Sequence, residues 1–204
     1  MGQPRFVILL GLAGALCSCS GKYPIVNAEP RGSTVIAFGD SLTEGVGARD
    51  GNDYPAVLSQ LLGVEVLNRG VAGETTTDAM RRLDEDVLNE DPRIVIVCLG
   101  GNDGIQKLPI ETTFANLRQI IETIQQKGAL VVLVGVRSAT LTDQYGGHFQ
   151  KLARETGCVL VPDILAGILS DPTKKSDPIH PNDAGYRLMA ERIAEKLVPF
   201  LKSS

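Results

Sequence analysis

The stretch Thr34-Val35-Ile36-Ala37-Phe38-Gly39-Asp40-Ser41 decides the fold and points to the chemistry of this chain. Its apolar and β-branched residues predict a buried strand over 34–38, which ends at Gly39-Asp40-Ser41. In an open parallel sheet the carboxyl ends of the strands border the ligand crevice, so a rigid element would hold Ser41 at that edge. Taken alone, Gly-Asp-Ser is more often an ordinary turn, because these three residues dominate turns.

Strands and helices alternate along the rest of the chain. Continuous apolar runs over 94–99 and 129–136 are typical of strands covered on both faces, and shorter runs predict strands at 64–68 and 158–162. Apolar residues recur at helical spacing between the strands, and a last helix is expected to begin after a cap at Asn182. We therefore predict an α/β fold, a three-layer α/β/α sandwich around five parallel strands.

Composition limits the class of protein. The 204 residues, 43% of them hydrophobic, suit one globular domain, which we place at 34–204. A net charge of −4, without clusters of Lys and Arg interleaved with aromatic residues, argues against nucleic-acid binding. Two histidines and no Cys-x-x-Cys or His-Glu-x-x-His pattern predict no metal site, and no cofactor is expected. Cys98 and Cys158 read as buried core residues, which could form a disulfide only if their strands brought them close.

The N-terminus carries a targeting segment. Arg5 is followed by an apolar run over 6–16 that is too short to span a bilayer, which predicts a signal peptide over 1–18. Residues 19–33 contain two prolines and few large apolar side chains, so we expect them to form a tether.

The end of the signal peptide predicts a lipid anchor. Leu16-Cys17-Ser18-Cys19 resembles the bacterial lipobox, which implies lipidation of Cys19 and attachment to a membrane of the cell envelope. Because Ser20 rather than Asp follows, the resemblance favours the outer membrane. Cys17 is atypical within a lipobox, so cleavage by the ordinary signal peptidase and release to the periplasm is the alternative.

Three later stretches supply what an activated serine needs: Asn68–Gly73, Gly100–Asp103 and Asp177–Pro181. A histidine is the natural base for a serine because its reference pKa is about 6.5, and a carboxylate three residues earlier can orient it. His148, the other histidine, lies at the border of an apolar helix face, so we leave it out of the site.

In order and spacing, these stretches resemble the SGNH hydrolases, also called the GDSL esterase/lipase superfamily. The four residues that give the family its name match Ser41, Gly73, Asn102 and His180. Gly-Gly-Asn-Asp-Gly at 100–104 is most similar to the branch of bacterial arylesterases, thioesterase I and lysophospholipases. The resemblance implies the flavodoxin-like strand order 2-1-3-4-5, which brings all four residues to one rim of the sheet.

The resemblance also implies a role for each site residue. Ser41 would be the nucleophile, His180 the base and Asp177 the residue that orients the base. The oxyanion hole would consist of the backbone N–H groups of Ser41 and Gly73 and the side-chain amide of Asn102. Without the resemblance, Gly73 and Asn102 would read as turn formers.

The function implied is a serine esterase that hydrolyses carboxylic esters through an acyl-enzyme intermediate. Its substrate would be a small ester, a lysophospholipid or an acyl thioester. Val136–Thr142 replaces a Pro-containing loop that helps line the acyl pocket in the thioesterase I branch, so acyl preference stays open. A carbohydrate or peptidoglycan O-acetylesterase is the first alternative. A non-catalytic envelope lipoprotein is the second, disfavoured because no catalytic position is missing.

Overall fold

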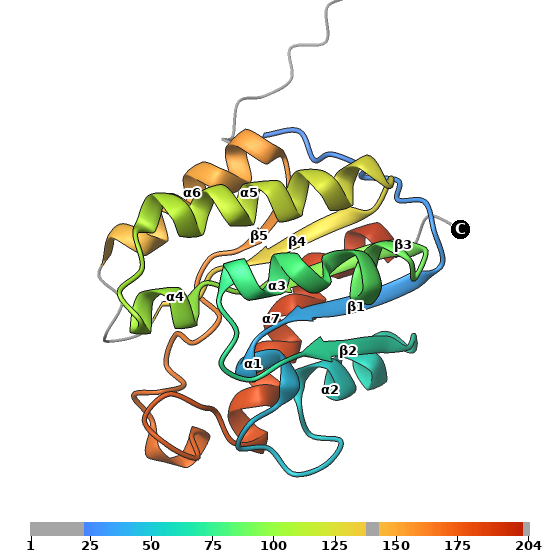
Figure 1. Ribbon diagram of the computed structural model, residues 1–204. Helices are drawn as coiled ribbons and strands as arrows, with labels where there is room; N and C mark the ends of the chain where they lie inside the picture. Colours follow the sequence, from blue (N-terminus) through green and yellow to red (C-terminus); the bar gives the residue numbers. More distant parts are fainter. Residues whose placement is uncertain (1–22, 138–142, 202–204) are drawn as a thin grey trace, which may run out of the picture.

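Five parallel strands form the central sheet of the computed structural model, which describes residues 23–137 and 143–201 (Figure 1). The strand order is β2-β1-β3-β4-β5, so the predicted α/β architecture and order are confirmed. Pro162 has no N–H to continue the ladder at the sheet edge, so the pairing of β4 and β5 stops before the predicted strand ends. The strands are β1 (Thr34–Gly39), β2 (Val66–Gly70), β3 (Pro92–Cys98), β4 (Leu130–Val134) and β5 (Val159–Val161).

Helices cover both faces of the sheet (Figure 1). Two that pack against each other lie on one face, and three that pack in series lie on the other. This completes the three predicted layers. The first face carries α2 (Tyr54–Leu62) and α7 (Asp183–Leu201), and the second carries α3 (Thr76–Leu83), α5 (Ile110–Gln126) and α6 (Asp143–Thr156).

The core lies between the layers and is deepest at β3 and β4. All five residues of β4 are buried, as expected of a strand with helices on both sides. Cys98 and Cys158 are both buried and free. Cys98 ends β3, Cys158 directly precedes β5, and β4 lies between these two strands. They therefore act as core residues, not as a disulfide.

Two short helices that the apolar pattern did not predict follow strands directly. The helix α1 (Ser41–Glu44) follows β1 at once, and α4 (Gly101–Ile105) follows β3. With four and five residues, they are too short to show helical periodicity. A π-helical turn over Asp84–Leu88 continues the chain after α3, and a 3₁₀ turn covers Pro172–Lys174.

Residues 23–33, here called the N-terminal strap, lie against the domain. The Tyr23 hydroxyl donates to the Cys158 carbonyl at 2.9 Å, and the Asn27 amide donates to the Ala129 carbonyl at 2.9 Å. The strap therefore runs along the amino ends of the strands before it enters β1 (Figure 1). This part of the expected tether is held in place, because its few polar and aromatic side chains reach carbonyls that precede β4 and β5.

The signal peptide and the lipidation site predicted at Cys19 lie outside the described residues. Within 23–137 and 143–201, no helix is long and apolar enough to cross a membrane.

Candidate active site

Ser41 lies where β1 ends and α1 begins, at the carboxyl edge of the sheet. The Asp40 side chain caps this short helix by accepting the Leu42 N–H at 3.0 Å. Gly39 is required by space: a Cβ there would lie 2.1 Å from the Thr43 hydroxyl oxygen and 2.5 Å from the carbonyl of a neighbouring strand. Close packing at the strand end therefore explains the Gly-Asp-Ser sequence and fixes the serine.

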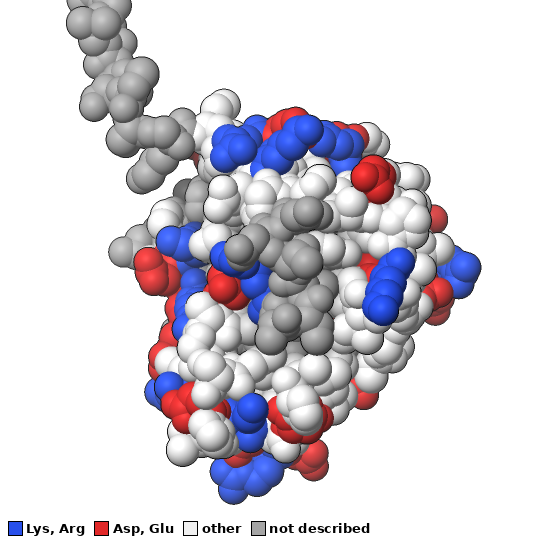
Figure 2. All heavy atoms as spheres, turned by 90° about the vertical axis from the view of Figure 1, so that its left-hand side faces the viewer, with Lys and Arg blue, Asp and Glu red and all other residues white. Residues whose placement is uncertain are grey.

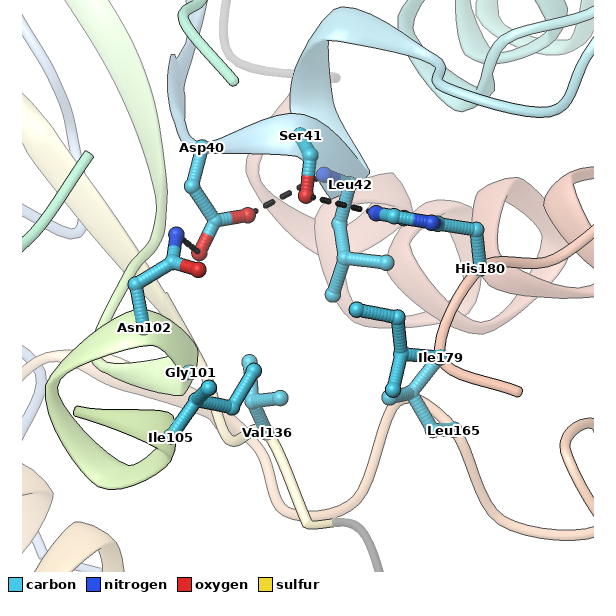
Figure 3. Close-up of a pocket in the computed structure, with 10 residues that line it drawn as sticks. All are labelled: Asp40, Ser41, Leu42, Gly101, Asn102, Ile105, Val136, Leu165, Ile179 and His180. Carbon is cyan, nitrogen blue, oxygen red and sulfur yellow. Dashed lines mark hydrogen bonds between the residues drawn. The ribbon is translucent and has the colours of Figure 1, made fainter. Parts of the chain in front are cut away.

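His180 reaches Ser41 from the loop before α7 (Figure 3), and Asp177 lies three residues earlier in the same loop. His180 Nε2 lies 3.0 Å from Ser41 Oγ, and His180 Nδ1 lies 2.7 Å from Asp177 Oδ2. With Nδ1–H donating to the carboxylate, Nε2 is free to accept the serine hydroxyl. The three residues thus form one hydrogen-bonded chain.

Asp177 is itself held by the turn that it begins. Its Oδ1 accepts the backbone N–H groups of Ile179 and His180, each at 2.8 Å. Burial alone would raise the pKa of Asp177, but these bonds and the bond from the His180 ring outweigh burial and lower that pKa below its ordinary value. The carboxylate therefore stays ionised beside the imidazole at neutral pH.

Asn102 enters the site from α4. Its Nδ2 donates to the Glu74 carbonyl at 2.8 Å and lies 3.4 Å from Asp40 Oδ2. The second contact is long for an N–H···O bond, so that hydrogen is available to a substrate oxygen. Asn102 is thereby attached to the loop that follows β2.

Gly73 lies in that loop with φ +82°, and a Cβ there would meet no neighbour. Its backbone conformation, not space, calls for glycine. Among the described residues, the N–H groups of Gly73 and Ser41 are donated to no other protein atom. Gly73 does not line the cleft described next, whereas Ser41, Asn102 and His180 do.

A cleft of about 400 Å³, including its part open to solvent, lies beside Ser41. Besides Leu42, which follows the serine, further aliphatic side chains line the cleft (Figure 3). They come from four different segments of the chain, and two of them, Val136 and Ile179, lie in stretches that the sequence singled out. These residues are Ile105, Val136, Leu165 and Ile179.

Asp40, in the wall of the cleft, has a carboxyl pKa far above its ordinary value. Burial raises its pKa to about 7, partly offset by the Leu42 N–H and by the positive charge that His180 can carry. Asp103, by contrast, is buried against α3, where it accepts the Thr76 N–H at 2.9 Å and the Thr76 hydroxyl at 2.6 Å. These bonds anchor the start of α3.

His148 is placed away from these groups. Its ring lies 4.9 Å from the Phe114 ring, between α6 and α5. Within the described ranges, no group of three or more His, Cys, Asp or Glu side chains could hold a metal ion.

Comparison with known proteins places the chain among acyl hydrolases. A model of the GDSL-like lipase/acylhydrolase family matches residues 37–188. The chain is 28% identical to an arylesterase of Vibrio mimicus, over 85% of this chain and 92% of the relative. It is also 28% identical to the thioesterase 1/protease 1/lysophospholipase L1 of Escherichia coli, over 82% of this chain and 85% of the relative. A crystal structure of TesA superposes with a TM-score of 0.77 at 25% identity, over 82% of this chain and 99% of that one.

Proposed function

The chain belongs to the GDSL-like lipase/acylhydrolase family, and from that membership we propose that it is a serine esterase that hydrolyses carboxylic esters through an acyl-enzyme intermediate. The observation that carries the proposal is the hydrogen-bonded chain from Ser41 through His180 to Asp177, with distances of 3.0 and 2.7 Å. Serine is a weak nucleophile until a positioned base accepts its proton, and His180 is that base.

The proposed reaction has two halves. Ser41 Oγ attacks the ester carbonyl while its proton passes to His180 Nε2, and Asp177 stabilises the resulting imidazolium. His180 then donates the proton to the leaving alcohol, which departs and leaves the acyl group on Ser41. Water, deprotonated by the same imidazole, hydrolyses this ester and restores the serine.

Negative charge on the carbonyl oxygen needs donors that are already in place. The backbone N–H groups of Ser41 and Gly73 make no other hydrogen bond among the described residues, and one amide hydrogen of Asn102 makes only a long one. We assign these three groups to the oxyanion hole.

The lining of the cleft supports an apolar acyl group. Ile105 and Ile179 remain 48% and 41% exposed beside the serine, so an acyl chain would cover apolar surface that now faces water. In Figure 2, the described surface directly below the grey atoms is mostly uncharged, whereas charged side chains lie to the left of those atoms and along the edge of the view. We therefore favour acyl esters longer than acetyl over acetylated glycans.

A panel of p-nitrophenyl esters from acetyl to palmitoyl, with a lysophospholipid, an acyl thioester and acetylated glycans, tests this proposal. Each methylene that becomes buried should raise kcat/KM about fourfold, from about 0.8 kcal/mol of transfer free energy, until the cleft is filled. Ser41→Ala should abolish hydrolysis with little change in melting temperature. A preference for acetyl esters together with turnover of acetylated glycans would favour the O-acetylesterase, and an inactive wild type would favour the binding lipoprotein.

We also propose that Cys19 carries a lipid that attaches the protein to the cell envelope. The lipobox-like sequence before Cys19 supports this assignment. Palmitate should label the wild type in a bacterial host and not Cys19→Ala. Label lost in Cys17→Ala but retained in Cys19→Ala would contradict the choice of cysteine.

A further inference from the structure

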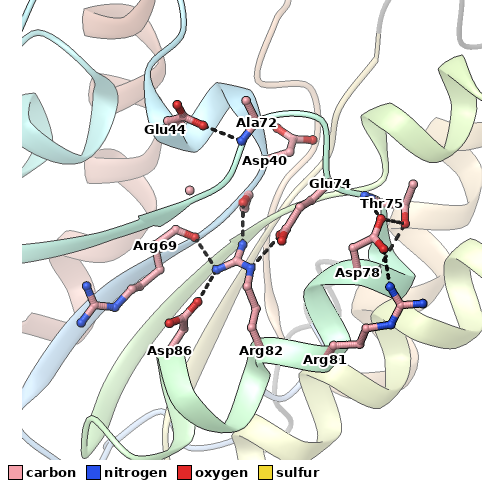
Figure 4. A network of polar contacts seen from close by, with 12 residues as sticks. Asp40, Glu44, Arg69, Ala72, Glu74, Thr75, Asp78, Arg81, Arg82 and Asp86 are labelled. Atoms are coloured by element: carbon pink, nitrogen blue, oxygen red, sulfur yellow. Dashed lines mark hydrogen bonds and ion pairs between the residues drawn. The ribbon is translucent and has the colours of Figure 1, made fainter.

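We propose that Arg82 of α3 is a positioning residue for the oxyanion hole, an inference that rests on the proposed esterase function. The Arg82 side chain is only 15% exposed and lies between two strand ends and the loop that carries Gly73 (Figure 4). It donates no hydrogen bond to Ser41 or His180, so any effect on the reaction would pass through the groups that it holds.

The guanidinium of Arg82 binds four parts of the protein at once (Figure 4). Nε donates to Glu74 Oε2 at 2.7 Å, and Nη1 donates to Asp86 Oδ2 at 2.6 Å. Nη1 also donates to the Arg69 carbonyl at 3.0 Å, and Nη2 donates to the Gly39 carbonyl at 3.0 Å. Arg82 thus connects the ends of β1 and β2 to the loop that follows β2 and carries Gly73.

Two of these contacts fix the loop relative to the nucleophile. The Gly39 carbonyl, two residues before Ser41, accepts both Arg82 and the Val71 N–H at 3.0 Å. The start of the loop and the guanidinium therefore share one acceptor on the strand that delivers the serine.

Glu74 connects Arg82 to two of the proposed oxyanion donors, the Gly73 N–H and the Asn102 amide. Its carboxylate binds Arg82, its carbonyl accepts the Asn102 amide at 2.8 Å, and it directly follows Gly73. A displacement of Glu74 would therefore move both the Gly73 N–H and the Asn102 amide. Misplacement of reacting groups by about 1 Å can lower a rate by about 10²-fold.

The geometry requires arginine specifically. A lysine ammonium is a compact point charge that cannot match the planar array of donors, nor replace the stacking of the Arg82 guanidinium 4.4 Å from the centre of the Phe38 ring. Because its partners are protein carbonyls and carboxylates, Arg82 is not expected to bind substrate. Its loss should therefore lower kcat and leave KM nearly unchanged.

The test compares Arg82→Lys with Arg81→Lys, its matched control. Arg81 lies on the same helix, is 73% exposed and, among the described residues, pairs only with Asp78. We expect Arg82→Lys to lower kcat per folded enzyme about 10- to 100-fold with KM within about threefold, and Arg81→Lys to leave both unchanged. Folded enzyme is counted by circular dichroism, which separates a loss of catalysis from a loss of stability.

A double-mutant cycle shows whether Arg82 acts through the oxyanion donors. If it does, Arg82→Lys should cost little further activity once Asn102→Ala is present. Glu74→Gln, which keeps the acceptor and removes the charge, should reproduce part of the loss and serves as the deciding variant if Arg82→Lys does not fold.

The outcomes are distinguishable. Wild-type hydrolysis that requires Ser41 is established first, and its absence would overturn the proposed function together with this inference. Given that activity, either of two results rejects the role of Arg82 alone: kcat per folded Arg82→Lys within threefold of wild type, or losses that multiply fully with those of Asn102→Ala.

Discussion

Asn102 has two amide hydrogens and one close acceptor, the Glu74 carbonyl. If the second hydrogen meets the oxyanion, Asn102→Ala should lower kcat about 10²–10³-fold with KM nearly unchanged, because the bond strengthens only as charge develops. A role in shaping α4 alone would instead lower stability by about 1 kcal/mol and leave activity per folded molecule near normal. Steady-state kinetics and thermal unfolding of the same preparation separate the two roles.

Asp40 should make stability depend on pH in an unusual direction. Its folded pKa of about 7 lies above the ordinary value of 3.8, so the folded state binds the proton more tightly than the unfolded state does. The free energy of unfolding therefore loses up to about 1.4 kcal/mol per pH unit from this group between pH 4 and 7. Asp40→Asn keeps the cap on Leu42 and removes the titration, so its stability relative to wild type should grow across that window. Urea unfolding at pH 4, 5.5, 7 and 8 measures this difference, and a difference independent of pH would contradict the assignment.

Among the elements, the N-terminal strap should stabilise the domain through a few specific bonds. Asn27 has a left-handed φ of +54° and donates to the Gln125 and Ala129 carbonyls at 2.8 and 2.9 Å. Asn27→Ala should lower the free energy of unfolding by about 2 kcal/mol, because two carbonyls lose their partner and alanine disfavours this φ. Activity per folded molecule should not change, since the strap lies at the other end of the strands from Ser41. Glu29→Ala, an exposed neighbour in the strap, is the control and should have an effect near zero.

The helices also show which structural features can be predicted from the sequence. The ends of α2 could be predicted because its signals are local: Asp53 accepts the Ala56 N–H at 3.0 Å, and Gly63 takes φ +67°. The cap at Asn182 before α7 is of the same kind, with its side-chain oxygen 3.0 Å from the Ala184 N–H. Such contacts span two to four residues, so they leave a pattern in the sequence.

The contacts that organise the site leave no such pattern. Arg82 meets the Gly39 carbonyl 43 residues away, and Asn102 meets the Glu74 carbonyl 28 residues away. A backbone carbonyl can belong to any residue type, so these partners could not be identified from the sequence. Ser41 and His180 could be paired beforehand only through the family resemblance, which supplied the strand order that brings them together.

For the molecule as a whole, the two ends of the sheet carry different features: the N-terminal strap lies at one end and the candidate active site at the other. The strap reaches the amino ends of β4 and β5 (Figure 1), whereas the cleft lies beside Ser41, which follows the carboxyl end of β1. The six residues of β1, at about 3.3 Å each, put roughly 20 Å between the two ends.

Because the strap and the cleft lie at opposite ends of the sheet, an N-terminal lipid anchor would set the orientation of the cleft relative to the membrane. Cys19 precedes Tyr23 by four residues, a reach of about 14 Å at full extension. A lipid on Cys19 would therefore hold the amino ends of the strands close to the bilayer. The cleft beside Ser41 would then face the aqueous compartment. Substrates would then arrive from solution, and lipids of the leaflet that holds the anchor would first have to leave it.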